Sequence, residues 1–325
     1  MTNKTLAILP PNWLGDVVMA QPAMRTFAEH YMAQKGYDQI VVCGRSWLAD
    51  LLPFLDLGSA TYSEIIPQAE SAVILPNSFS SAWKVFHSRT GERIGFRGQW
   101  RSLLLNRGYS PQLDMMHEHH RDYFLNLAEQ ASIPVHEREV KLHIDQTDVE
   151  AGCALMREHG LDPEKTICVA PGAQFGGAKR YPSESYRYVL KWLSEAGWQI
   201  LVLGTPAERK IGDHCLEDVT TPCWNSSGDT TLTQALQILT ACRLLLCNDS
   251  GLMHVAAGMS KPVVGIFGAT APERTAPSGA HVQLLYKPAI CSPCLQRECT
   301  TPGHPCMGNI LPETVRDSCL TLLTA

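Results

Sequence analysis

Short runs of β-branched and aliphatic residues alternate with longer amphipathic segments along most of the chain. Such alternation is typical of a parallel sheet covered by helices on both faces, because each helix returns the chain to the start of the next strand. An α/β fold is therefore the expected class. In the first half, the sequence predicts strands over 6–9, 40–43, 72–75 and 140–144, and helices over 15–30, 47–54, 80–86, 117–131 and 147–159.

The pattern starts again after a break near 160–164, which predicts a second sheet. The length of 325 residues agrees with two domains, since single domains usually hold about 150 residues. We expect one domain over 1–160 and another over 161–325. In the second, the sequence predicts strands over 166–170, 199–203, 244–247 and 263–267, and helices over 183–196, 206–217, 232–241 and 252–258.

The composition limits the classes of partner and compartment. Hydrophobic residues make up 45% of the chain and charged residues 18%, which excludes an intrinsically disordered protein. A net charge of −5 argues against nucleic acid as the partner, so an anionic ligand must meet a local basic patch. The apolar run 6–9 is too short for a signal peptide, and no run approaches the roughly 20 residues of a membrane span. We therefore expect a cytoplasmic protein with reduced cysteines.

Ligands of open α/β sheets bind at the carboxyl ends of the strands, so the loops after strands hold the candidate site residues. After the first strand, Gly15 permits a tight turn and Asp16 falls in the first turn of the next helix. Asp16 can cap that helix and complement its dipole, or it can take a proton from an incoming hydroxyl. The G-x-G-x-x-G pattern of dinucleotide-binding proteins is absent here.

The loop 171–182 follows the first strand of the second domain and contains three glycines. Its adjacent cations, Lys179 and Arg180, can meet a phosphate on this permissive backbone. The P-loop pattern is not satisfied, because Ala178 separates the last glycine from the lysine. An ordinary loop with a solvated basic pair is the alternative interpretation.

The third motif is a polar turn, 248–251, that opens a helix rich in small residues. Backbone N–H groups at a helix start bind anions, and diphosphates are common ligands of such sites. His254 lies about one turn beyond Ser250 on the same helix face. A hydrogen-bonded core histidine is the alternative for His254, but the neighbouring Asp249 and Ser250 favour a functional site.

These motifs, with the segments 75–82 and 93–98, resemble glycosyltransferase family 9, the ADP-heptose:lipopolysaccharide heptosyltransferases, and its heptosyltransferase II branch in particular. The resemblance implies a GT-B fold, in which two Rossmann-like domains face each other across a cleft. The N-terminal domain would bind the acceptor and the C-terminal domain the nucleotide sugar. The implied activity is inverting transfer of L-glycero-D-manno-heptose from ADP-heptose to the lipopolysaccharide inner core, with the second heptose on heptosyl-Kdo2-lipid A favoured.

The resemblance also implies roles for single residues. Asp16 would be the general base, Lys179 would hold the donor phosphates, and Glu208 would contact the ribose. Gln174 departs from the heptosyltransferase I branch, which carries hydroxyl residues at this position and the next. No metal or cofactor is expected for catalysis, since cations and amides can stabilise the departing diphosphate. The full set of expected donor-binding residues is Lys179, Arg180, Gln174, Glu208, Asp249, Ser250, Gly251 and His254.

Other activities stay open at this stage. The chain can be a heptosyltransferase of type I that uses a different core acceptor, or a GT-B-like sugar-nucleotide epimerase. A nucleotide-sugar-binding protein without turnover is disfavoured because Asp16 and Lys179 are both present. A dinucleotide oxidoreductase is least supported, since its glycine fingerprint is missing.

The only dense basic stretch runs over 89–107 and contains five arginines at intervals of about four to six residues. A solvated helix face is one interpretation, although three glycines argue against a long helix. The other is recognition of an anionic acceptor, namely the carboxylates and phosphates of the lipopolysaccharide core. A membrane-bound acceptor would require contact with the inner face of the cytoplasmic membrane, although no amphipathic anchor is evident. The expected acceptor-binding residues are Asn77, Ser78, Ser80, Arg97 and Arg101.

Four cysteines lie within one short window near the C-terminus: Cys291, Cys294, Cys299 and Cys306. They can form a structural zinc site or hold an iron–sulfur cluster, they can form disulfides, or they can be free thiols in a packed loop. The usual zinc pattern has two C-x2-C knuckles, and this window has one. The resemblance implies that the segment is a lineage trait rather than catalytic machinery.

Overall fold

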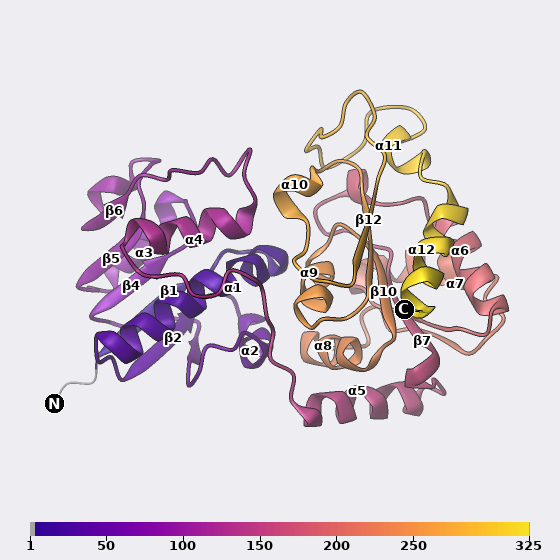
Figure 1. Cartoon of the computed structure of the whole chain (residues 1–325), viewed down its shortest axis with the longest axis horizontal. Helices are drawn as coiled ribbons and strands as arrows, with labels where there is room; N and C mark the ends of the chain where they lie inside the picture. The colour runs from indigo at the N-terminus through magenta and orange to yellow at the C-terminus, as the bar shows by residue number, and fades with distance from the viewer. Residues whose placement is uncertain (1–3, 325) are drawn as a thin grey trace. The chain divides into compact units, whose positions relative to one another are not determined.

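The computed structural model describes residues 4–324, so Met1, Thr2 and Asn3 of the N-terminal segment, and Ala325, lie outside the described residues. The chain divides into two compact units, Met1–His143 and Ile144–Ala325, and each contains one six-stranded sheet (Figure 1). Every described strand pairing is parallel. The predicted α/β class is confirmed.

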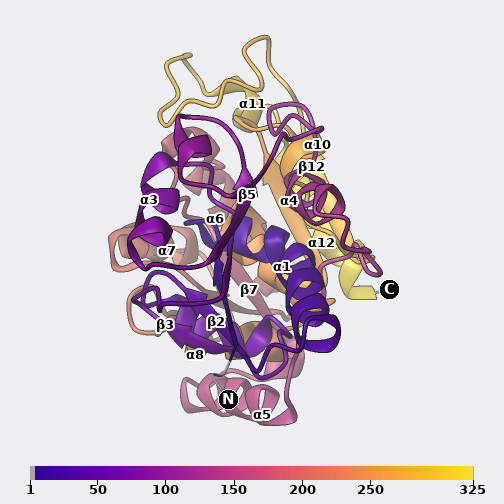
Figure 2. The same ribbon diagram turned by 90° about the vertical axis from the view of Figure 1, so that its left-hand side faces the viewer.

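The first unit is a doubly wound sheet. Its strands are β1 (Thr5–Leu9), β2 (Gln39–Cys43), β3 (Thr61–Ser63), β4 (Ser71–Ile74), β5 (Glu92–Phe96) and β6 (Arg107–Tyr109), and its helices are α1 (Leu14–Glu29), α2 (Leu48–Leu51), α3 (Phe79–His87) and α4 (His120–Gln130). The strand order is β3-β2-β1-β4-β5-β6. Figure 2 shows α3 on one face of this sheet and α1 with α4 on the other. Leu6, Ala7 and Ile8 of β1 are therefore buried on both faces.

The second unit repeats this architecture with the strand order β12-β11-β10-β7-β8-β9. Its strands are β7 (Thr166–Ala170), β8 (Gln199–Val202), β9 (Cys223–Asn225), β10 (Leu244–Asn248), β11 (Val263–Phe267) and β12 (Val282–Tyr286). Its helices are α5 (Gln146–Glu158), α6 (Ser183–Glu195), α7 (Arg209–Leu216), α8 (Leu232–Ala241), α9 (Gly251–Gly258), α10 (Pro272–Thr275), α11 (Pro305–Gly308) and α12 (Pro312–Thr324).

The boundary between the units differs from the expected one at 160/161, because α5 packs against α8 of the second unit. The two helices approach closely at Gly152, where an added Cβ would lie 2.1 Å from the Gln237 carbonyl oxygen. The Gln237 amide also donates to Asp148 Oδ1 at 3.1 Å. Because a helix belongs to the core that buries it, α5 is part of the second unit.

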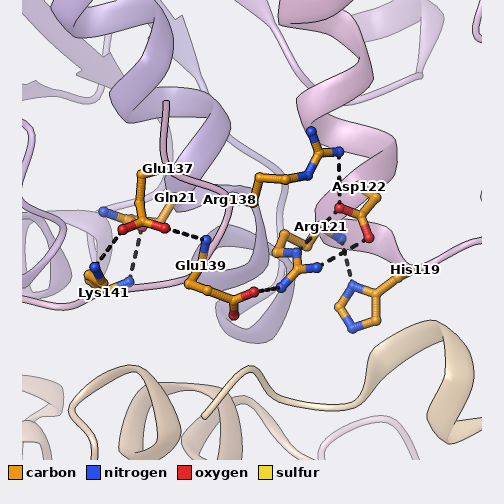
Figure 3. A network of polar contacts seen from close by, with 8 residues as sticks. All are labelled: Gln21, His119, Arg121, Asp122, Glu137, Arg138, Glu139 and Lys141. Carbon is orange, nitrogen blue, oxygen red and sulfur yellow. Dashed lines mark hydrogen bonds and ion pairs between the residues drawn. The ribbon is translucent and has the colours of Figure 1, made fainter. Parts of the chain in front are cut away.

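The strand predicted over 140–144 is wrong. Lys141 N donates to the side-chain oxygen of Gln21 on α1 at 3.4 Å, and His143 N donates to the Phe54 carbonyl at 2.9 Å. These backbone donors therefore serve a side chain and a loop rather than a neighbouring strand. Figure 3 shows this segment beside α1, with Glu137 bonded to both Lys141 Nζ and Glu139 N.

Five strands were not predicted from the sequence, and the short ones among them lie toward the sheet edges. β3 and β9 have three residues each and stay partly exposed, so they carry no apolar run that marks a buried strand.

Among the helices of residues 4–324, none is long and apolar enough to cross a bilayer.

Candidate active site

Asp16 lies in the first turn of α1, the helix that follows β1, and faces a histidine from a distant part of the chain. His120 Nδ1 is 3.2 Å from Asp16 Oδ1, with the two side chains 12% and 25% exposed. Asp16 does not cap the helix, since the capping position is Trp13. The carboxylate is therefore held by His120 through one oxygen while a quarter of its side-chain surface stays open to solvent.

His120 was not singled out from the sequence, although a signal existed. Three histidines, His117, His119 and His120, stand at the start of the helix predicted over 117–131. In the structure, His119 is the N-cap of α4, and its Nδ1 accepts from Arg121 N at 3.1 Å. One histidine thus caps the helix while the next reaches across to Asp16.

The start of α4 is braced by the ion-pair network in Figure 3. Arg121 pairs with Glu139 at 2.8 Å and with Asp122 at 3.3 Å. Arg138 pairs with Asp122 at 3.4 Å and with Glu129 at 2.8 Å. α4 also packs along α1, the helix that carries Asp16. These contacts hold the residue that bonds Asp16 at a fixed place.

A groove of about 350 Å³ opens at the carboxyl ends of β1, β2 and β4 in the first unit. Two of the expected acceptor-binding residues, Ser78 and Ser80, line it. Ser78 also caps α3 by accepting from Ser81 N at 3.2 Å. Two cations that the sequence analysis did not single out, Arg45 and Lys84, line the same groove.

The five arginines of the basic stretch do not share a helix, because their segment contains β5. Arg97 is exposed and follows this strand directly. Arg101 is fully buried, and its guanidinium donates to the carbonyls of Pro76 and Ile74. Burial lowers the pKa of Arg101 to about 10, so the group stays cationic at neutral pH. The expected role of Arg101 as an acceptor contact does not fit this burial. Its side chain instead anchors the turn that leads into α3.

Asn77, an expected neutral acceptor partner, is engaged on one side within the first unit. Its amide donates to the Tyr123 hydroxyl at 2.7 Å. Its carbonyl oxygen is buried and has no hydrogen-bond partner within residues 4–324. An acceptor group that reached this oxygen would have to donate a hydrogen bond to it.

In the second unit, two motifs predicted separately are joined by a buried ion pair. Lys179 Nζ lies 2.6 Å from Asp249 Oδ2, and Asp249 is 5% exposed at its side chain. Thr270 Oγ1 donates to the same carboxylate oxygen at 2.6 Å. The ammonium also stands 5.0 Å from the centre of the Phe175 ring. A cation is thus held at the end of β10, beside the start of α9.

Asn248, the last residue of β10, ties the loop 171–182 to this position. Its side-chain nitrogen donates to the carbonyls of Pro171 at 2.8 Å and Gly172 at 3.1 Å. Its side-chain oxygen accepts from Tyr181 N at 3.1 Å and from the Tyr186 hydroxyl at 3.0 Å. All four contacts are buried, so this asparagine fixes the shape of the loop.

The start of α9 presents unsatisfied polar groups. Ser250 is the N-cap residue, yet its side chain makes no capping bond. Its buried Oγ has no nitrogen or oxygen partner among the described residues, and neither does the buried Nε of Arg180. Gly251 begins the helix, and His254 is buried one turn further on. A helix start whose N-cap hydroxyl makes no capping bond suits an anionic oxygen.

Glu208, at the end of a short 3-10 helix, and Gln174, on the loop 171–182, lie near this region. Glu208 Oε2 accepts from Thr205 N and from Thr205 Oγ1, both at 2.8 Å, which closes a capping box. A Cβ at Gly172 would lie 1.9 Å from Glu208 Oε1, so a larger residue here would have to displace the Glu208 carboxylate. Glu208 therefore contacts the loop 171–182 directly. Gln174, on the same loop, is exposed.

The cysteine window packs against the same loop. The twelve cysteines, all within the described chain, are free thiols. Across residues 4–324, no three His, Cys, Asp or Glu side chains gather so as to hold a metal ion. Ala178 N donates to the Arg297 carbonyl at 2.9 Å, and His304 Nε2 lies 2.9 Å from the Ala178 carbonyl. The window thus supports the turn that carries Lys179.

The sequence of residues 67–304 matches the family model of glycosyltransferase family 9 (heptosyltransferase). The chain belongs to this family. It is 29% identical to lipopolysaccharide heptosyltransferase 2 of Escherichia coli K12 over 316 residues, 86% of this chain and 87% of that protein.

Solved structures of family 9 enzymes share the fold. The structure of E. coli ADP-heptose lipopolysaccharide heptosyltransferase II matches with a TM-score of 0.81 and 27% identity, covering 98% of both chains. E. coli heptosyltransferase WaaC with ADP matches with a TM-score of 0.73 at 14% identity, covering 98% of this chain and 99% of that one. The expected GT-B class is thereby confirmed.

Each unit presents one cluster of charged side chains among the residues expected from the sequence. Glycosyl transfer requires a base for the acceptor hydroxyl and positive charge for the departing diphosphate. The first unit of this family 9 protein presents the carboxylate of Asp16, and the second presents Lys179 at a helix start. Of the expected residues, Lys179 and Asp249 are brought into direct contact, whereas Arg101 and Asn77 are engaged within the first unit itself.

Proposed function

We propose that this protein transfers L-glycero-D-manno-heptose from ADP-heptose to the lipopolysaccharide inner core, adding the second heptose to heptosyl-Kdo2-lipid A with inversion. The named relative, a lipopolysaccharide heptosyltransferase 2, supports this acceptor. The assignment of Asp16 as the catalytic residue rests on the Asp16–His120 contact. His120 engages Oδ1 of Asp16, so Oδ2 remains for a substrate. In this proposal the first unit binds the acceptor and the second binds the sugar nucleotide.

Asp16 is the general base of the proposed reaction. His120 holds Oδ1, and Oδ2 takes the proton from the acceptor hydroxyl as its oxygen bonds to the anomeric carbon. The bond from that carbon to the diphosphate breaks at the same time, and its electron pair leaves with ADP. Attack from the face opposite the leaving group inverts the anomeric centre, so one carboxylate suffices.

The donor groups lie along the loop 171–182, the end of β10 and the start of α9. Lys179 and Arg180 neutralise the diphosphate, while Ser250 Oγ and the Gly251 N–H donate to its oxygens. The Ser250 hydroxyl, which makes no capping bond, supports this assignment. Asp249 fixes the ammonium of Lys179. The remaining proposed donor contacts are Glu208 to the ribose, His254 and Asp249 to the heptose and diphosphate, and Gln174 at the open edge.

The acceptor occupies the groove of the first unit. Ser78 and Ser80 offer hydroxyl groups to the sugar, and Arg45 and Lys84 offer cations to the Kdo carboxylates. Arg97, which is exposed, is a further contact to core phosphates. Because the acceptor is a lipid, the enzyme works at the inner face of the cytoplasmic membrane.

An acceptor comparison tests the proposal. The purified protein is incubated with ADP-heptose and either Kdo2-lipid A or heptosyl-Kdo2-lipid A, and the products are identified by mass spectrometry. We expect extension of the heptosylated acceptor only. Extension of Kdo2-lipid A alone would show a type I enzyme, and epimerised sugar nucleotide without transfer would show an epimerase. Asp16→Asn is the matched control, since it keeps the size of the side chain and removes the base.

A further inference from the structure

A row of aromatic side chains is exposed on α3. Phe79, Trp83 and Phe86 each keep 43–45% of their surface open, while Ala82 and Val85 on the other side of the helix are fully buried. The rings form a continuous row, with centres 5.9 Å apart between Phe79 and Trp83 and 6.3 Å apart between Trp83 and Phe86. Large exposed apolar patches of this kind mark interaction sites.

Two further exposed apolar side chains lie in the turn that follows β5, which packs against α3. Trp100 and Leu103 are each 85% exposed, and they flank the buried Arg101. Arg101 bonds to Pro76, two residues before the N-cap of α3, so this turn is fastened beside the start of the helix. Trp100 has a φ of +63°, a left-handed conformation that is costly for a bulky residue. The fold thus holds an exposed tryptophan in an unfavourable backbone state.

The charges around these rings have one sign. Residues 76–110 contain six Lys and Arg and one acidic residue, a net +5 in a chain whose total is −5. The acidic residue, Glu92, is turned inward, where it accepts from the Tyr31 hydroxyl at 2.7 Å and pairs with Arg107 at 2.8 Å. Lys84 and Arg89 are exposed beside the rings. No carboxylate of this segment is therefore left to repel an anionic surface.

We propose that α3 and the turn 97–103 form a docking surface for a bilayer that contains anionic phospholipids. Tryptophan and phenylalanine insert at the level of the lipid headgroups, and cations between them attract anionic lipids. The rings stack on one another along the helix, and the Arg93 guanidinium lies 5.4 Å over the Phe86 ring, so these ring faces are occupied, whereas a nucleic-acid site presents free ring faces to the bases. The charge and ring pattern therefore favour a membrane over single-stranded nucleic acid.

The docking surface adjoins the acceptor groove, since α3 contributes to both. Ser80 and Lys84 line the groove, while Trp83 and Phe86 are exposed along the same helix. A bilayer bound at the rings would therefore lie near the groove that we assign to a lipid-linked acceptor. The inference does not depend on heptose transfer, because it predicts binding to vesicles that contain no lipopolysaccharide.

Vesicle flotation with the full chain tests the surface. We expect binding to vesicles of 30% phosphatidylglycerol in phosphatidylcholine and at least tenfold weaker binding to phosphatidylcholine alone. The double variant W83S/F86S, and separately Trp100→Ser, should weaken binding to the anionic vesicles at least tenfold. Tyr188→Ser and Leu311→Ser are matched controls, since both residues are comparably exposed on the second unit, and they should bind as the parent does.

Three results would overturn the proposal: absence of vesicle binding by the parent, equal binding by the ring variants, or tighter binding to an oligothymidylate than to vesicles. Unchanged thermal unfolding of the variants shows that the loss is local, as exposed rings predict. Heptose transfer to a delipidated acceptor in vesicle-free solution should stay within twofold of the parent in W83S/F86S. Loss of heptose transfer in this vesicle-free assay would bear on the catalytic proposal. Loss of vesicle flotation alone bears on the docking surface.

Discussion

Replacing His120 by alanine tests how Asp16 is oriented. The structure joins the two side chains by one contact of 3.2 Å, with both largely shielded from water. A hydrogen bond to a charged group contributes about 1.5–3 kcal/mol. The distance is long for a charge-assisted bond, so the lower value of about 1.5 kcal/mol applies. That corresponds to about a tenfold loss of kcat in His120→Ala, since 1.36 kcal/mol is one factor of ten.

The matched variants separate orientation from other roles. Asp16→Asn should lower kcat about 10²- to 10⁴-fold, because it removes the base itself. His120→Ala added to Asp16→Asn should cost nothing further, since no carboxylate is left to orient. His120→Asn places an amide N–H near the position of Nδ1 and should restore much of the rate. His119→Asn keeps a good helix cap and should leave kcat unchanged.

The assay is the initial rate of ADP release at saturating ADP-heptose and acceptor. Full activity of His120→Ala would refute the reasoning about orientation. A larger loss in His120→Ala than in Asp16→Asn would reverse the assignment and make His120 the base.

Three further predictions concern the second unit. Lys179→Met should weaken ADP binding about 10- to 100-fold in titration calorimetry, because a charge-assisted contact of about 1.5–3 kcal/mol is lost, and unchanged affinity would exclude Lys179 from the phosphate site. Gly172→Ala should lower the free energy of unfolding by about 1–3 kcal/mol in urea, since the added methyl group overlaps the Glu208 carboxylate; a neutral result would mean that the carboxylate moves freely. The hydrogen bond to Glu217 raises the pKa of the partly exposed His214, so the folded chain favours the protonated form and this stabilisation fades as pH rises through the raised pKa. His214→Gln should therefore lower Tm at pH 5.5 and match the parent at pH 9, and an equal Tm shift at both values would contradict the linkage.

Strand prediction from sequence succeeded where strands are apolar throughout. β1, β7, β10 and β11 lie inside their sheets, so burial on both faces leaves an uninterrupted aliphatic run. The same signal misled at 140–144. Val140 and Leu142 are buried, but their alternation reflects packing on the first unit rather than strand pairing, because the backbone donors bond to Gln21 and Phe54.

How well a site residue could be predicted from sequence depends on how far along the chain its partners lie. The loop positions of Asp16, Lys179 and Asp249 follow from local motifs: Asp16 lies at a helix start, Asp249 directly after β10, and Lys179 within the loop between β7 and α6. Arg101 and Glu208 carry the charge that the motifs suggest, yet neighbouring backbone groups engage them. The sequence pattern gives residue type and spacing. The burial of a side chain depends on which other segments of the chain pack against it.

The amino-acid sequence by itself determined the α/β class, the repeated architecture and the loops in which the chemistry lies, because hydrophobic periodicity and turn residues act over short stretches of chain. Only the tertiary structure decided the pairings. Lys179 meets Asp249 across 70 residues and Asp16 meets His120 across 104. These contacts arise from the order of strands in each sheet and the packing of α4 on α1. Both are long-range arrangements, which the local sequence around either partner does not encode.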